Sequence, residues 1–256
     1  MIFKKKNELY QTEPGVEYFT VYADMIDNTG HMLIGGTTGS GKSVLINALV
    51  STAILNHTPT EANFIFIDPK RIELDLYRGL PHTIGYADTT DGIIRALDRA
   101  SDIMESRFAE MKRQGIRTYV GKKIFVVVDE LGDLLTNPAH TPQQHRHIVG
   151  TFQHIMQLGR AAKVFIIAAT QSPSRQTIPA ALRLNFTDFV ALRCASAIEA
   201  RQVIGESGAE KLPIYGHALY RTPNYTTVQK VKINKYSDEW IGDRCAYWMT
   251  KDCRTN

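Results

Sequence analysis

The stretch from residue 36 to residue 43 has the types and spacing of a phosphate-binding loop. It reads Gly-Thr-Thr-Gly-Ser-Gly-Lys-Ser and fills the template G-x-x-x-x-G-K-[ST] at every fixed position. Glycine is needed because successive backbone N–H groups must curl closely around a phosphate. We expect Lys42 to reach the β- and γ-phosphates of a nucleotide and the Ser43 hydroxyl to hold Mg²⁺. The residues predicted to contact ATP are Gly36, Thr37, Thr38, Gly39, Ser40, Gly41, Lys42, Ser43 and Val44.

Two adjacent carboxylates could complete a hydrolytic site. The apolar run at 124–128 is followed directly by Asp129 and Glu130, which is the Walker B pattern. In that pattern Asp129 binds Mg²⁺, directly or through water, and Glu130 orients and polarises the attacking water. The alternative is that Asp129 caps the next helix. Gln171 ends a further apolar run, and we interpret it as a γ-phosphate sensor, although strand-end amides are often turn residues.

The elements that must position these side chains alternate along the chain. Apolar runs at 31–34, 63–68, 124–128, 164–169 and 189–192 predict strands, and residues 220 and 228–233 predict a late β element. Helices are predicted after the loop (44–50) and over 92–114, 143–161, 197–205 and 238–249. Such alternation indicates an α/β fold, a mostly parallel sheet with helices on both faces. The phosphate loop would then lie at the carboxyl ends of the strands, as in a P-loop NTPase core.

Composition narrows the class of protein further. The chain has 256 residues, 43% of them hydrophobic, and a formal net charge of +4, which is typical of a globular protein. Three cysteines, none in a C-x-x-C pair, indicate free thiols in a reducing compartment. No apolar run is long enough to cross a bilayer, and the amino terminus does not read as a signal peptide. We therefore expect a cytoplasmic protein with no membrane insertion.

Taken together, the motifs resemble the motor domain of the FtsK/SpoIIIE DNA translocases over about residues 30–235. The stretches that carry the resemblance are 36–44, Ile67-Asp68-Pro69-Lys70, Gly79-Leu80-Pro81-His82, 128–134, Gly159-Arg160-Ala161-Ala162, Ala169-Thr170-Gln171, Glu199-Ala200-Arg201 and 208–212. The resemblance implies a RecA-like ATPase domain over 31–235, preceded by an N-terminal extension with a short β element at 16–22 (1–30). A C-terminal helix and tail (236–256) follow.

The resemblance also implies an assembly and a partner. It implies a homohexameric ring around double-stranded DNA, with ATP hydrolysis at subunit boundaries. Arg201 matches the family's arginine finger, which would reach into the neighbouring site. Arg160 is a second candidate arginine near the nucleotide, and Lys70 is a candidate for contact with phosphate or with a neighbour.

Some positions depart from the family pattern. Ser172 stands where an arginine is common, Gly132 where an alanine is common, and residues 213–217 replace a common L-G-R-G-D stretch. These departures bear on subunit contacts and DNA grip and leave the Walker residues intact. With no membrane anchor before the motor and no room for a winged-helix module after it, we expect a motor that serves a mobile element or plasmid or chromosome transfer.

A translocase must grip phosphates without reading bases. Arg175 and Arg183 follow the Gln171 strand and are the favoured DNA contacts, since a loop beside a nucleotide sensor can move with hydrolysis. A solvated charged face is the alternative for both. Two other functions stay open: a coupling or packaging ATPase that delivers DNA to a membrane, secretion or replication partner, and an ATP-binding scaffold with slow turnover. Glu130 argues against the scaffold.

Overall fold

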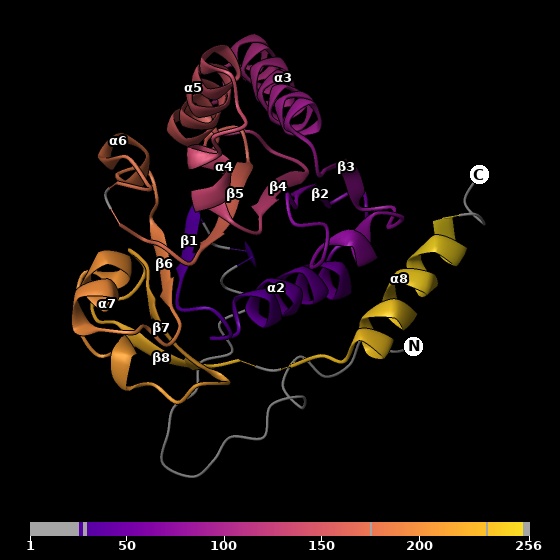
Figure 1. Cartoon of the computed structure of the whole chain (residues 1–256). Coiled ribbons are helices and arrows are strands. Elements are labelled where there is room, and N and C mark those ends of the chain that lie inside the picture. The colour runs from indigo at the N-terminus through magenta and orange to yellow at the C-terminus, as the bar shows by residue number, and fades with distance from the viewer. Residues whose placement is uncertain (1–25, 28–29, 175, 234, 253–256) are drawn as a thin grey trace.

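The computed structural model describes residues 26–27, 30–174, 176–233 and 235–252. Within them the chain forms an eight-stranded sheet of order β3-β2-β4-β5-β1-β6-β7-β8 (Figure 1). The strands from β3 to β6 run parallel, and β7 and β8 are antiparallel to their neighbours. The predicted mostly parallel sheet is therefore confirmed. The strands are β1 (Met32–Gly35), β2 (Ala62–Ile67), β3 (Thr83–Ala87), β4 (Lys123–Val128), β5 (Val164–Thr170), β6 (Asp188–Ala191), β7 (His217–Arg221) and β8 (Gln229–Lys232).

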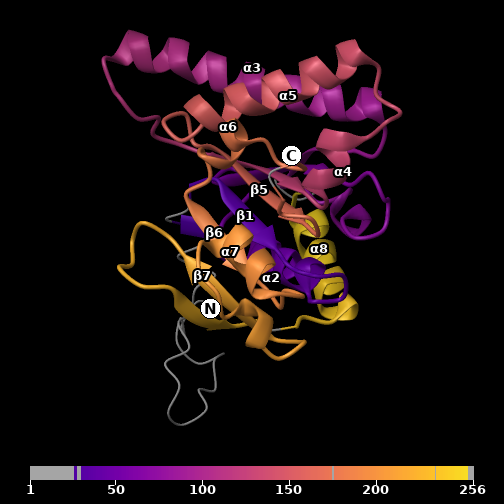
Figure 2. The same cartoon turned by 60° about the vertical axis from the view of Figure 1, so that its left-hand side comes forward.

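Helices cover both faces of this sheet, as predicted (Figures 1 and 2). Strand side chains alternate between faces, so Phe125 and Val127 of β4 join one core while Val126 joins the other. The first core is closed by α2 (Lys42–Asn56) and α8 (Asp238–Asp252). The second core is closed by the longer helices α3 (Thr90–Gln114) and α5 (Pro142–Leu158), by α7 (Ala197–Ile204) and by the short helices α4 (Leu131–Thr136) and α6 (Ala180–Arg183).

The ends of the two long helices follow local rules. The predicted cap at Gly115 is confirmed, since this residue ends α3 in the left-handed region at φ 68°. Helix α5 opens with a capping box between Thr141 and Gln144. It ends at Leu158, so the predicted extension to residue 161 is wrong. The reason is that Gly159 already accepts a hydrogen bond from the N–H of Val164, which turns the chain into β5.

The C-terminal helix packs against the body of the fold. Ile241 and Cys245 are buried in the α2 core, and the indole N–H of Trp248 donates to the carbonyl of Ile54 at 2.9 Å. Helix α8 thus closes the same core as α2. The predicted strand at 16–22 and Cys253 lie outside the described residues. Among the described helices, none has both the length and the apolar character that crossing a bilayer requires.

Candidate active site

The sheet order brings the predicted site residues to one edge. Strand β5 lies between β4 and β1, so the carboxyl ends of these parallel strands are neighbours. The carboxylates Asp129 and Glu130 follow β4, Gln171 follows β5, and the phosphate loop follows β1. Three segments that are far apart in the sequence therefore meet at the edge where ligands of parallel α/β sheets bind.

The glycines of the phosphate loop are required for two different reasons, backbone conformation and lack of space for a side chain. Gly39 and Gly41 have φ of 74° and 100°, and a Cβ at either position would meet nothing within 4 Å. These two positions require glycine for its backbone freedom. Gly36 instead requires space, because its Cβ would lie 2.6 Å from Ser40 Oγ and 2.8 Å from Leu192 Cβ. The tight, glycine-dependent loop predicted from the sequence is confirmed.

The loop is suited to hold an anion. Lys42 is buried, and its Nζ donates to the carbonyls of Gly36 at 2.9 Å and Thr37 at 2.8 Å, so the ammonium lies over the loop. Burial lowers the pKa of Lys42, against the opposing effect of Glu130. Ser40 Oγ is buried without a hydrogen-bond partner, which leaves a polar atom for a phosphate or a water to satisfy. These residues fit a nucleotide phosphate.

The Walker B carboxylate Asp129 is suited to a divalent cation. It is 8% exposed, and its pKa is raised to about 6, first by burial and then by the neighbouring carboxylates of Asp68 and Glu73. A cation would relieve this crowding. Mg²⁺ takes one or two protein ligands and completes its shell with phosphates and water, a pattern that Asp129 and the Ser43 hydroxyl would meet. Among the described residues, no cluster of three or more metal-ligating side chains occurs.

The second carboxylate, Glu130, is 3% exposed and held by backbone donors. Both of its oxygens accept from the N–H of Gln171 at 3.1 Å, and Oε1 accepts from the N–H of Gly132 at 3.3 Å. The latter bond caps α4. The alternative that Asp129 caps this helix is therefore wrong, since Glu130 does so and Asp129 is left available.

Gln171 connects the carboxylates to the phosphate loop. While its N–H holds Glu130, its side-chain Oε1 accepts a hydrogen bond from Thr38 Oγ1 at 2.6 Å. Both contacts follow from the position of β5 between the two neighbouring strands. The sequence placed Gln171 at this site correctly, and its role as a sensor stays a prediction.

Asp68 lies beside the site, and the sequence analysis quoted it within the 67–70 stretch without giving it a role. It is fully buried at the end of β2 and accepts four backbone N–H groups, from residues 71 to 74, at 3.0 to 3.1 Å. It therefore shapes the loop that carries Lys70, whose Nζ lies 3.3 Å from Asp133 Oδ2. A carboxylate followed by proline after a buried strand was the available signal.

The candidate arginines lie in different places. Arg201 is exposed on α7. Arg160 follows α5 beside the start of β5, where its charge adds to burial in lowering the pKa of His31 to about 4. Since His31 precedes β1, Arg160 lies at the amino edge of the sheet, and its predicted position near the nucleotide is wrong for the site of its own subunit. Arg175 lies outside the described residues.

Arg183 is half-buried and bonded to the chain itself. Its Nη1 donates to the carbonyl of Pro173 at 3.1 Å and its Nη2 to that of Val203 at 3.4 Å. The sequence did not reveal these two bonds within the chain, and the DNA contact through Arg183 stays a prediction.

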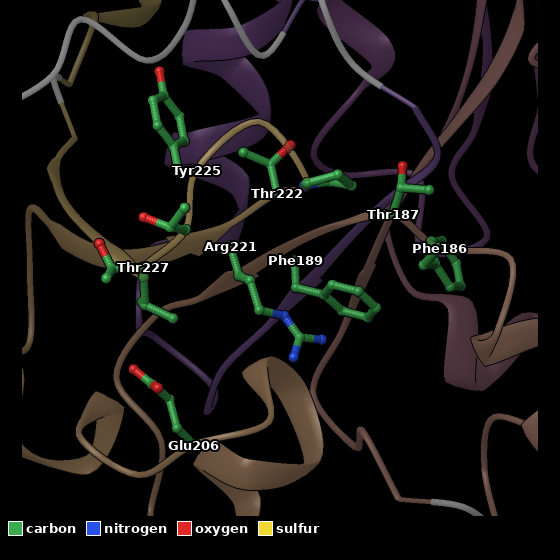
Figure 3. Close-up of a pocket in the computed structure, with 11 residues that line it drawn as sticks. Phe186, Thr187, Phe189, Glu206, Arg221, Thr222, Tyr225 and Thr227 are labelled. Carbon is green, nitrogen blue, oxygen red and sulfur yellow. The ribbon is translucent and has the colours of Figure 1, made fainter.

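A separate hollow of about 760 Å³ lies beside the start of β6 and the turn between β7 and β8 (Figure 3). The guanidinium of Arg221 stacks over the Phe189 ring there, 4.5 Å from its centroid. A Cβ at Gly205 would meet this guanidinium at 2.5 Å, so Arg221 rests against the C-terminal cap of α7. None of the predicted site residues lines this hollow.

Comparison with known proteins points to one family. The model of the FtsK/SpoIIIE family matches residues 15–123. The DNA translocase FtsK of Staphylococcus epidermidis is 32% identical over 237 residues, which cover 85% of this chain and 29% of the relative. The DNA translocase FtsK of Agrobacterium fabrum is 29% identical over 265 residues, with 86% of this chain and 29% of the relative covered. The chain thus spans 29% of the length of either relative.

Solved structures share the fold. The monomer form of the pCW3 conjugation coupling protein TcpA with ATPγS superposes with a TM-score of 0.74 at 19% identity, covering 86% of this chain and 64% of that one. The cytoplasmic domain of the type VII secretion ATPase EccC of Thermomonospora curvata gives a TM-score of 0.69 at 23% identity, with 86% and 28% covered. At these identities the likeness concerns the fold, and it confirms the predicted RecA-like α/β core.

Proposed function

We propose that this chain, which belongs to the FtsK/SpoIIIE family, is an ATP-driven motor that translocates double-stranded DNA. One observation carries the proposal: Gln171 joins Thr38 of the phosphate loop to Glu130, through its side-chain oxygen at 2.6 Å from Thr38 and its backbone N–H at 3.1 Å from both carboxylate oxygens. Such a connection suits a protein in which the state of the nucleotide drives movement. The curated relatives with which the chain shares about 30% identity are DNA translocases.

In the proposed reaction each residue of the edge has one task. Residues 36–44 bind the phosphates of ATP, and Lys42 meets the charge of the β- and γ-phosphates. Ser43 and Asp129 would hold Mg²⁺, which when bound would supply charge neutralisation for the transferred phosphoryl group. Glu130 orients the attacking water. Gln171 senses loss of the γ-phosphate through its side-chain bond to Thr38 of the phosphate loop.

The proposed active form is a cytoplasmic homohexameric ring. Arg201 suits a finger that acts on the neighbouring subunit, because it matches the family's finger position and is exposed on α7. Arginine fingers are worth about 10³ to 10⁵ in turnover. DNA would pass through the ring, and Arg175 is the proposed phosphate contact. Arg183, the other predicted contact, is bonded to two carbonyls of its own chain and has a different proposed role.

ATPase and translocation measurements test the proposal. We expect linear duplex DNA to stimulate ATP turnover and the protein with ATP to displace a triplex-forming oligonucleotide from duplex DNA. E130Q should bind ATP and fail in both assays, and R201A should lose turnover that returns when its subunits are mixed with E130Q subunits. If duplex DNA leaves turnover unchanged, the translocase proposal is wrong and the ATP-binding scaffold is favoured.

The coupling or packaging alternative predicts a different result. A fold shared with a conjugation coupling protein does not choose between these functions. An ATPase that hands DNA to another machine should need that machine for processive movement. Triplex displacement by the purified chain alone would therefore favour the autonomous translocase, and stimulation by DNA without displacement would favour the coupling role.

A further inference from the structure

Arg183 occupies a bridging position between two functional segments. Its guanidinium donates through Nη1 to the carbonyl of Pro173 and through Nη2 to the carbonyl of Val203. Pro173 lies two residues after the sensor Gln171, and Val203 lies two residues after the candidate finger Arg201. One side chain thus joins the loop behind the sensor to the helix that carries the finger.

The loop behind the sensor is tied together by hydroxyl groups. The N–H of Ser172 donates to Thr170 Oγ1 at 3.1 Å, and Thr177 Oγ1 bonds to the hydroxyls of Ser172 at 3.1 Å and Ser174 at 2.9 Å. Because these bonds hold the turn on both sides of Pro173, a displacement of Gln171 is expected to carry the Pro173 carbonyl with it. The loop also lies against the Walker B segment, since a Cβ at Gly132 would meet Thr177 Cγ2 at 2.9 Å.

Helix α7, which carries the candidate finger Arg201, packs against β1, the strand that leads into the phosphate loop. Val203 packs directly over Gly35, the last residue of β1, where a Cβ would lie 2.4 Å from Val203 Cγ2. The carbonyl of Val203 lies in the last turn of α7, where carbonyls lack helical partners and accept well from cationic donors. Arg183 therefore supplies one of the contacts that set the position of α7, and with it the position of Arg201.

We infer that Arg183 is a positioning residue: it transmits the nucleotide state sensed by Gln171 to α7 and so places Arg201 for the neighbouring site. This inference rests on the proposed function, in which Arg201 acts in trans. It concerns a path within one subunit that links its own site to the next one. This role requires a side chain that donates to both carbonyls at once. A planar guanidinium offers two donors at fixed angles, and an ammonium does not.

Two other roles for Arg183 predict different behaviour. A phosphate contact with DNA needs a positive charge, so R183K should keep it and R183M should lose it. Loss of the contact in R183M should reduce the slope of log DNA affinity against log salt concentration by about 1. A purely structural cap of α7 should lower stability in both variants without a specific effect on the neighbouring site. The positioning role predicts that both variants lose turnover while DNA affinity is kept.

The experiment measures ATP turnover, nucleotide affinity, DNA affinity and thermal unfolding for the parent, R183K and R183M. We expect kcat with duplex DNA to fall about 10- to 100-fold in both variants, as for a misplaced catalytic group, with KM for ATP and the Kd for DNA unchanged. R107K is the matched control. Arg107 also donates to two carbonyls, here both from Nη1, to Ala162 at 2.7 Å and Lys163 at 3.2 Å, at the opposite edge of the sheet. R107K should lower thermal stability and keep kcat.

Mixed subunits give the deciding readout. R183M subunits keep an intact Walker B, and E130Q subunits keep a well-placed finger, so mixtures should recover turnover that neither variant shows alone. No recovery at any ratio, or an R183K protein with the kcat of the parent, would overturn the inference. A parent that duplex DNA does not stimulate would overturn the proposed function instead, while R201A with the turnover of the parent would overturn the trans finger and the role of Arg183 together.

Discussion

Replacing Asp129 with asparagine should stabilise the protein without nucleotide while abolishing hydrolysis. The pKa of Asp129 is raised from 3.8 to about 6 by burial and by the charges of Asp68 and Glu73. A carboxyl whose pKa is raised in the folded state destabilises the fold when it is ionised. The cost is absent below the unfolded pKa of 3.8, grows through the window up to about 6 and is complete above it. At about 1.4 kcal/mol per pKa unit, the full cost is about 3 kcal/mol.

The assay is urea unfolding of the parent and D129N, without nucleotide or Mg²⁺, at two pH values. At about pH 8 the variant should be more stable than the parent by up to about 3 kcal/mol. At about pH 5 the gain should be about half of that, because Asp129 of the folded parent is then mostly protonated and only part of the ionisation cost remains. D133N is a suitable control, since Asp133 is half-exposed in an ion pair with Lys70 and should change stability by less than about 1 kcal/mol. A gain for D129N that is equal at both pH values, or a loss at the higher one, would refute the reasoning.

Two further substitutions test the network around the site and the fold behind it. Q171A removes the 2.6 Å contact with Thr38 but keeps the backbone N–H that holds Glu130, so kcat should fall about 10²-fold with ATP affinity kept; stopped-flow nucleotide binding beside steady-state turnover checks this, and a change confined to affinity would contradict it. Y220F removes the buried 2.7 Å hydrogen bond from the Tyr220 hydroxyl to Asp188 Oδ1, which should cost about 1 to 3 kcal/mol of stability in urea unfolding. Unchanged stability would mean that the other donors to Asp188 compensate.

The sequence predicted the site well where local chemistry decides the structure. A glycine-rich loop of this composition has few other conformations. An apolar run that is followed directly by polar residues shows where a buried strand ends at the edge of the sheet. Helix α3 was predictable because Met104 and Met111 belong to an apolar stripe of helical period that ends at a glycine cap. Each of these signals lies within a short window of the chain.

The rest depends on contacts between distant segments. Strand β3 was missed because it is a half-buried edge strand, with Thr83 and Gly85 among its five residues, and its apolar pattern is weak. The end of α5 depends on a hydrogen bond from Val164 that forms only when β5 is in place. The position of Arg160 at the amino edge could not be read from the Gly-Arg-Ala-Ala stretch, because neighbouring residues in sequence do not reveal which edge of a sheet they face.

The sheet order is the least predictable feature and the one on which the mechanism depends. Had β4 and β1 been neighbours, Glu130 would lie beside the phosphate loop with no residue between them to report on the nucleotide. With β5 inserted between the two strands, Gln171 contacts the loop through its side chain and the carboxylate through its backbone. A backbone donor cannot move without moving the chain that follows it, so any shift of Gln171 also moves the loop that Arg183 grips. The same insertion that places the sensor therefore gives the nucleotide state a route toward α7 and the surface that bears Arg201.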